Sequence, residues 1–330
     1  MLTQLKRYGI DLYTLLLLGT VALAIVLPAR GAAAPIVSSV AYYAVALLFF
    51  LYGARLKLET VWAGLTDWRL QGLMFGSTYV LFPILALILA WTLGSMIGPE
   101  LSAGIIFLGI LPSTVQSSIA FTGLAKGDVA GAICGATLSN LAGVFITPAL
   151  AALMLGATGG GFSWQAVGSI AVQILLPFIL GMVLRRFIGG WVEKQRMLTL
   201  TVDRGSILLI VYSAFGAGVV AGVWQQVPVT ALLTIIAVDA VLLAVVVVCL
   251  RLAGSWAGLG TPQQTALLFC GATKSLASGL PIAVLLFPSQ IVSIVVLPLM
   301  LFHQLQLLVF ASVAQRRRLQ LSEAGLAATP

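Results

Sequence analysis

Two short polar stretches interrupt long apolar runs of this sequence, and each contains a proline and several hydroxyl side chains. The first polar stretch spans residues 112–118 and reads PSTVQSS, and the second spans residues 271–281 and reads GATKSLASGLP. Proline removes a backbone hydrogen bond, and lipid cannot satisfy the freed carbonyl and amide groups. Such stretches must therefore line a cavity or face protein, where helix dipoles and free carbonyls can bind ions and substrates. The alternative is a pair of simple proline kinks.

The polar side chains of these stretches are the candidates for binding a substrate or a coupling ion. They are Thr114, Gln116, Ser117 and Ser118 in the first stretch, and Thr273, Lys274, Ser275 and Ser278 in the second. Placing Lys274 at the centre of a membrane helix costs roughly 2.5–3.5 kcal/mol. Asp239, in the middle of the preceding apolar run, is a candidate partner for it. Two interpretations stay open for this pair: a structural salt bridge, and a role in binding the ion or substrate.

Two further polar residues lie inside apolar runs. His303 lies in the last run with Gln304 and Gln306, and Asn140 follows Ser139 in an earlier one. Both are candidates for contact with substrate or a proton. Because a polar side chain in lipid must face protein, hydrogen bonding between helices is the simpler account of each.

The composition determines the class of protein that must position these residues. Hydrophobic residues make up 61% of the 330 residues and charged residues 8%, whereas a soluble domain carries about 25% charge. This excludes a cytosolic enzyme, a disordered chain and a disulfide scaffold, and no nucleophile–base–acid set is evident. The basic residues that give the net charge of +8 lie at the ends of apolar runs, so they do not indicate nucleic-acid binding. Three scattered cysteines and one histidine give no zinc or redox pattern, so no cofactor is expected.

The apolar runs predict an all-α polytopic membrane protein with ten transmembrane helices in a single membrane domain over residues 1–330. A span needs roughly 20 apolar residues. The predicted spans are Ile10–Pro28, Ile36–Leu56, Trp68–Leu93, Leu101–Leu124, Asp128–Leu155, Ser163–Ile188, Ser206–Trp224, Val227–Leu252, Thr261–Phe287 and Ser289–Ala314, followed by a cytoplasmic tail over residues 315–330.

The two halves of the chain resemble each other weakly. Phe107-Leu108-Gly109 precedes the first polar stretch and Phe269-Cys270-Gly271 begins the second, each in the fourth span of its half. An odd number of spans per repeat reverses the membrane orientation. We therefore predict two inverted five-helix repeats, over 1–158 and 159–330, as in many secondary transporters. Chance likeness between two apolar hairpins is the alternative.

Three segments give the chain a resemblance to the bile acid:sodium symporter family, and more closely to its SBF-like branch. They are FLYGARLKL at residues 50–58, the first polar stretch running on into LAKGDV at residues 124–129, and the segment of residues 269–281. The resemblance implies a panel and a core domain, with broken fourth and ninth helices that cross in the core. It also implies secondary transport of organic anions, often with sodium.

The same resemblance implies a sodium site at Ser117 and Ser118, with a contribution from the fifth helix near Thr137. The family's ninth-helix glutamate falls near Phe269 or Cys270, and no acid stands there in this sequence. The coupling ion, whether sodium, a proton or none, therefore stays open.

The sequence as a whole predicts a secondary transporter of a small organic anion in a bacterial-type inner membrane. Its expected partners are the anion and the lipid bilayer, with no obligate protein partner. A non-transporting membrane sensor or scaffold is the alternative.

Both termini are predicted to be cytoplasmic. With an inside N-terminus, 15 of the 17 Lys and Arg residues fall on the inner side, Arg30 falls outside and Lys274 lies within a span. Reporter fusions at the C-terminus and in the 158–162 loop should report cytoplasm and periplasm respectively. A periplasmic C-terminus would contradict both the orientation and the number of spans.

Overall fold

The computed structural model describes residues 12–55, 67–156, 164–222, 225 and 227–327, and this part of the chain contains helices and no strand. Lys6, Arg7 and Lys57, and the predicted repeat boundary at residues 158–159, lie outside the described residues. The helices are α2 (Leu12–Val26), α3 (Ala33–Arg55), α5 (Trp68–Gly76), the π-helix η1 (Ser77–Leu81), α6 (Phe82–Ile97), α7 (Pro99–Ile110), α8 (Gln116–Leu124), α9 (Val129–Gly156), α10 (Trp164–Lys194), α11 (Arg196–Val220), α12 (Val229–Trp256), α13 (Thr261–Gly271), α14 (Leu276–Leu286), α15 (Val292–Val295) and α16 (Leu297–Ala327).

Eight helical segments of the described chain are long and apolar enough to cross a membrane. The prediction of an all-helical, multi-span membrane protein is therefore confirmed. The count of ten spans stays a prediction, because the other two predicted spans correspond to shorter helices. They are α2, with 15 described residues, and the separate helices α7 and α8.

The two polar stretches coincide with interruptions of helical structure. We call residues 111–115, between α7 and α8, the first break, and residues 272–275, between α13 and α14, the second break. Pro112 lies inside the first break, where it has no N–H to continue the helix. In the second polar stretch, Pro281 lies within α14, and the chain is extended at Ser275 before that helix begins.

A third irregularity, which the sequence analysis did not predict, lies in the helical segment from Trp68 to Ile97. The amide of Phe82 donates to Ser77 O, five residues back, so residues 77–81 form a turn of π-helix. Pro83, the next residue, has no N–H to donate. The carbonyl of Thr78 therefore receives no hydrogen bond from either of these two residues.

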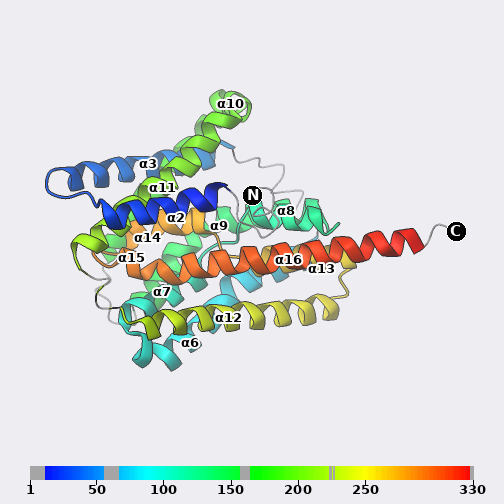
Figure 1. Ribbon diagram of the computed structural model, residues 1–330. Helices are drawn as coiled ribbons and strands as arrows, with labels where there is room; N and C mark the ends of the chain where they lie inside the picture. The colour runs from blue at the N-terminus through cyan, green and yellow to red at the C-terminus, as the bar shows by residue number, and fades with distance from the viewer. Residues whose placement is uncertain (1–11, 56–66, 157–163, 223–224, 226, 328–330) are drawn as a thin grey trace.

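The helices form layers around the two breaks. Figure 1 shows α2, α3, α10 and α11 on one side of the molecule and α6 and α12 on the other, with α7, α14, α15 and α16 between them. Two glycines let α3 and α10 touch along their backbones. A Cβ at Gly53 would lie 2.0 Å from Phe178 O, and one at Gly181 would lie 2.0 Å from Phe50 O.

The second break belongs to the most enclosed part of the described bundle. In the segment Thr261–Leu286, 89% of the most apolar window is buried, against 22–56% in the other seven candidate spans. Because this segment is so enclosed, the backbone groups of the second break must be hydrogen-bonded by other protein groups.

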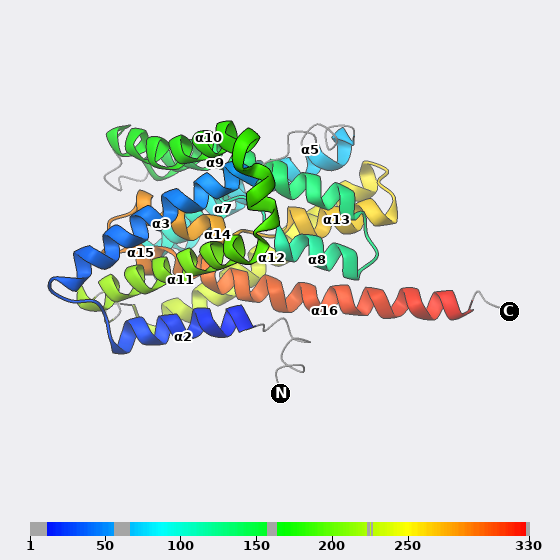
Figure 2. The same cartoon turned by 90° about the horizontal axis from the view of Figure 1, so that it is seen from above.

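The predicted tail continues α16 as far as Ala327, and Figures 1 and 2 show this end extending beyond the other helices.

Candidate functional site

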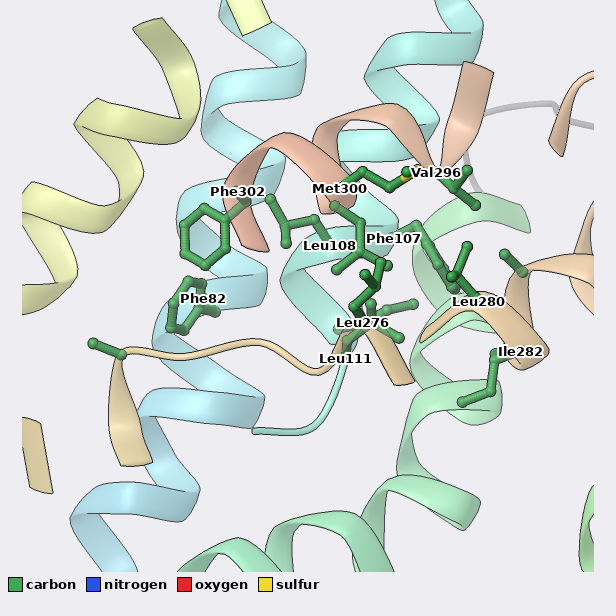
Figure 3. Close-up of a cluster of buried hydrophobic side chains, with 14 of the residues drawn as sticks. Phe82, Phe107, Leu108, Leu111, Leu276, Leu280, Ile282, Val296, Met300 and Phe302 are labelled. Carbon is green, nitrogen blue, oxygen red and sulfur yellow. The ribbon is translucent and has the colours of Figure 1, made fainter. Parts of the chain in front are cut away.

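The two breaks contact each other directly. The hydroxyl oxygens of Ser113 and Thr273 lie 2.9 Å apart, and the amide of Ser275 donates to Pro112 O at 2.8 Å. Ser113 also donates to Cys270 O. Figure 3 shows Leu111 and Leu276 together where the extended segments pass, among the side chains of the buried hydrophobic cluster. The structure thus brings together two segments that are 160 residues apart in the sequence.

Each carbonyl from Leu108 to Thr114 accepts a hydrogen bond. The donors, in order of the carbonyls, are the Leu111 amide, the Lys274 ammonium, the Thr147 hydroxyl, the Lys274 ammonium again, the Ser275 amide, the Asn140 amide and the Ser118 hydroxyl. Five of these seven hydrogen bonds come from elements other than α7, α8 and the first break itself. The first break is therefore stable only while the surrounding elements stay in place.

The second break is satisfied by side chains in the same way. Thr273 donates its hydroxyl to Phe269 O, and the Ser77 hydroxyl donates to Gly271 O at 2.7 Å. The side-chain amide of Gln306 bonds both backbone groups of Lys274, accepting from its N–H at 2.8 Å and donating to its carbonyl at 2.9 Å. Gln306 Nε2 also lies 2.9 Å from Nδ1 of His303. His303 therefore belongs to the support of the second break.

Lys274 is fully buried, and its ammonium lies among main-chain carbonyls. Nζ donates to Thr78 O at 2.9 Å and to the carbonyls of Gly109 and Leu111 at 2.7 Å each. It also lies 4.2 Å from the centroid of the Phe82 ring, which packs edge-to-face on Phe302. Figure 3 shows these two rings next to each other beside the second break.

The suggested pair of Lys274 with Asp239 does not form. All three donors of the ammonium are used by carbonyls. Asp239 is 1% exposed, and neither of its carboxyl oxygens has a hydrogen-bond partner among the described residues. The sequence located the two buried ionisable groups, but the salt bridge that it offered as one interpretation does not form. Main-chain carbonyls bind the ammonium instead, and no sequence pattern identifies such acceptors.

Asn140 connects both breaks to α9. Its Nδ2 donates to Ser113 O at 2.8 Å, and its Oδ1 accepts from the Ser278 hydroxyl, also at 2.8 Å. Ser275 accepts from the amide of Ser278 and so caps the start of α14. Asn140, Ser275 and Ser278, three of the predicted site residues, thus form one hydrogen-bonded group.

The predicted residues at the start of α8 are more accessible. Gln116 is exposed and Ser117 is half-buried, whereas Thr114 and Ser118 are buried. The hydroxyl oxygens of Thr114 and Ser117 lie 2.6 Å apart, and Thr114 reaches Thr273 at 3.5 Å. Ser118 donates to Thr114 O, and the half-buried Thr137 donates to Ile133 O within α9. No side chain caps the N-terminus of α8.

Several groups that support the site were not among the predicted residues. They are Ser113, Ser77, Gln306, Phe82 and the carbonyl of Thr78. Two signals could have located some of them. Pro83 has no N–H and so signals an irregular turn in its helix, and Gln306 follows His303 by three residues, which places both on one helix face.

Comparison with known proteins gives matches over nearly the whole chain. Residues 11–318 match the profile of the SBF-like CPA transporter family. A protein of Pseudomonas aeruginosa named as uncharacterized is 48% identical over 327 residues, which are 98% of each chain. “Putative symporter YfeH” of Escherichia coli is 44% identical over 94% of each chain. Sodium/bile acid cotransporter 7 of Rattus norvegicus is 26% identical over 82% of this chain and 80% of its own.

Replacing Gln306 by leucine should destabilise the second break. The change keeps the side-chain volume but leaves the N–H and carbonyl of Lys274 unsatisfied, at a cost of about 1–3 kcal/mol for each group. We expect a clearly lower midpoint of thermal unfolding in detergent. Gln304→Leu, two residues away on α16 and half-buried, is the matched control. Equal midpoints for the two variants would contradict the supporting role of Gln306.

Proposed function

This chain belongs to the SBF-like CPA transporter family, and from that premise we propose that it is a secondary transporter of a small organic anion in a bacterial inner membrane. The family and the names of its relatives indicate a membrane transporter and not an enzyme. The anionic substrate, the inner membrane and the coupling ion are parts of the proposal.

The observation that carries the anion proposal is the uncapped, accessible N-terminus of α8 at the contact between the breaks. The first amides of a helix have no intrahelical acceptor, and the helix dipole places partial positive charge there. Val115 is 38% exposed and Gln116 is exposed, so other parts of the described chain do not cover this end of the helix. The start of α14 is linked to the first break, because Ser278 donates to Asn140, whose side-chain amide donates to Ser113 O. Positive helix ends that meet at membrane depth suit a carboxylate or a similar anion.

The side chains at this end of α8 suggest how an anion would be held. Gln116 supplies an amide N–H, and Ser117 supplies a hydroxyl whose orientation is set by Thr114 at 2.6 Å. Lys274 offers no free donor, because its three N–H bonds go to carbonyls. We therefore assign substrate contact to Gln116 and Ser117, and a supporting role to Lys274.

Sodium at Ser117, Ser118 and Thr137 has little support from the contacts of these residues. The Ser118 hydroxyl donates to the carbonyl of Thr114 in the first break, and the Thr137 hydroxyl donates to Ile133 O within α9. We expect transport without a sodium requirement.

The anion proposal predicts saturable uptake into proteoliposomes for at least one member of a panel of small carboxylates and sulfonates. Gln116→Leu should raise KM by ~10-fold or more, since one hydrogen bond to a charged partner contributes about 1.5 kcal/mol or more. Thr234→Val, which removes an exposed hydroxyl from α12, is the control and should leave KM unchanged. Binding of an anion without any uptake would favour the sensor or scaffold alternative, and an unchanged KM in Gln116→Leu would remove that residue from the site.

Asp239 is the group that we propose to carry a coupling proton. Its carboxyl group is buried in α12 without a hydrogen-bond partner in the described residues, so an ionised form would lack compensation there. An imposed inward proton gradient should drive accumulation of the anion, and an imposed sodium gradient should not. Asp239→Asn, which keeps the shape, should lose accumulation but retain one-for-one exchange of the anion. Gradient-driven accumulation at the wild-type level in Asp239→Asn would contradict this assignment.

A further inference from the structure

The ammonium group of Lys274 has as many hydrogen atoms as it has carbonyl acceptors around it. Lysine Nζ carries three hydrogen atoms only when it is protonated, and a neutral amine would present a lone pair to one neighbour. Three carbonyl oxygens, those of Thr78, Gly109 and Leu111, lie 2.7–2.9 Å from Nζ. The aromatic face of Phe82, at 4.2 Å, adds a further favourable contact for a cation. The geometry therefore fits a charged ammonium.

Local sequence explains why these carbonyls are free to receive a cation. Thr78 O lacks a donor because the Phe82 amide bonds Ser77 O and Pro83 has no N–H. Gly109 O would pair with the Ser113 amide in a continuous helix, but that amide donates to the Ser139 hydroxyl at 3.0 Å. Leu111 lies in extended backbone just past the end of α7. The backbone therefore leaves these three carbonyls without helical donors, whichever side chain stands at position 274. We call the three carbonyls the cage.

No carboxylate compensates the charge in this cage. The ammonium donates only to carbonyls, and the carboxyl oxygens of Asp239 have no hydrogen-bond partner among the described residues. Gly109 and Leu111 stand at the C-terminal end of α7, where the helix dipole is negative. Carbonyl oxygens without a carboxylate are also what proteins use to replace the hydration shell of a monovalent cation.

We propose that Lys274 is a tethered substitute for a bound monovalent cation, and that the carbonyls of Thr78, Gly109 and Leu111 form a cation site that a small residue at position 274 would open. The tethered charge joins η1, the end of α7 and the second break without any ion from solution. For transport, this inference rests on the proposed function and explains why no sodium is required. The cage itself is tested by binding, which does not depend on transport.

The test measures the thermal unfolding midpoint of the purified full-length chain in detergent, in chloride salts of Na⁺, K⁺ or choline at constant ionic strength. The wild-type midpoint should be the same in all three salts. Lys274→Ala should have a lower midpoint in choline, and Na⁺ or K⁺ should raise it saturably by several degrees, as expected for a ligand that binds only the folded state. Lys274→Met is the matched control, because its side chain fills the cage without charge; its midpoint should be low in all salts.

Two results would overturn the inference. One is a folded Lys274→Ala whose midpoint is equal in Na⁺, K⁺ and choline. The other comes from lysine-selective ¹⁵N NMR of the wild-type protein, which covers the case in which Lys274→Ala fails to fold. That experiment should show a slowly exchanging NH₃⁺ signal that is missing in Lys274→Met, and a neutral amine signal would contradict the cage. If cation binding is found but no anion is transported, the proposed function fails and the cation site stands.

Discussion

The absence of water in the bilayer core is the constraint on which this structure depends. A helix that is interrupted there exposes carbonyls and amides that lipid cannot satisfy, at several kcal/mol for each group. This chain interrupts its helices at Pro112 and again before Leu276, and it adds a π-helical turn before Pro83. Hydrogen bonds join these interruptions. Ser77 and Ser113 donate to carbonyls at the end of α13, and the Ser275 amide donates to Pro112 O. The three irregular segments are therefore stable only together.

This mutual dependence determines where function can reside. The groups in the middle of the cluster, Lys274 above all, are buried and fully bonded, so they hold the structure and cannot also bind a substrate in this conformation. The first turn of α8 is different, because its amides are uncapped and Gln116 is exposed. In the proposed transport cycle, an anion at this helix end could leave while the hydrogen bonds of the buried centre stay unchanged.

The sequence was informative where the signal is local. Pro112 with its hydroxyl neighbours predicted the first break, and the polar residues around Lys274 predicted the second, because polarity at membrane depth stands out against an apolar background. It was uninformative where the partner is a main-chain group. The acceptors of Lys274 are three carbonyls, and a carbonyl belongs to every residue, so the search for a counter-charge led to Asp239 instead. The π-helical turn was not predicted for a related reason: Pro83 is compatible with an ordinary helix until the acceptor of the Phe82 amide, Ser77 O, is known.

The contact between the two breaks is the central claim, and a disulfide formed across it tests that claim most directly. Ser113 and Thr273, whose hydroxyl oxygens lie 2.9 Å apart, would be replaced together by cysteine in a chain whose three native cysteines are changed to alanine. Mild oxidation in native membranes should link the pair, and mass spectrometry should find the two peptides joined, while either single variant stays unlinked. Two free thiols after oxidation of the double variant would contradict the account.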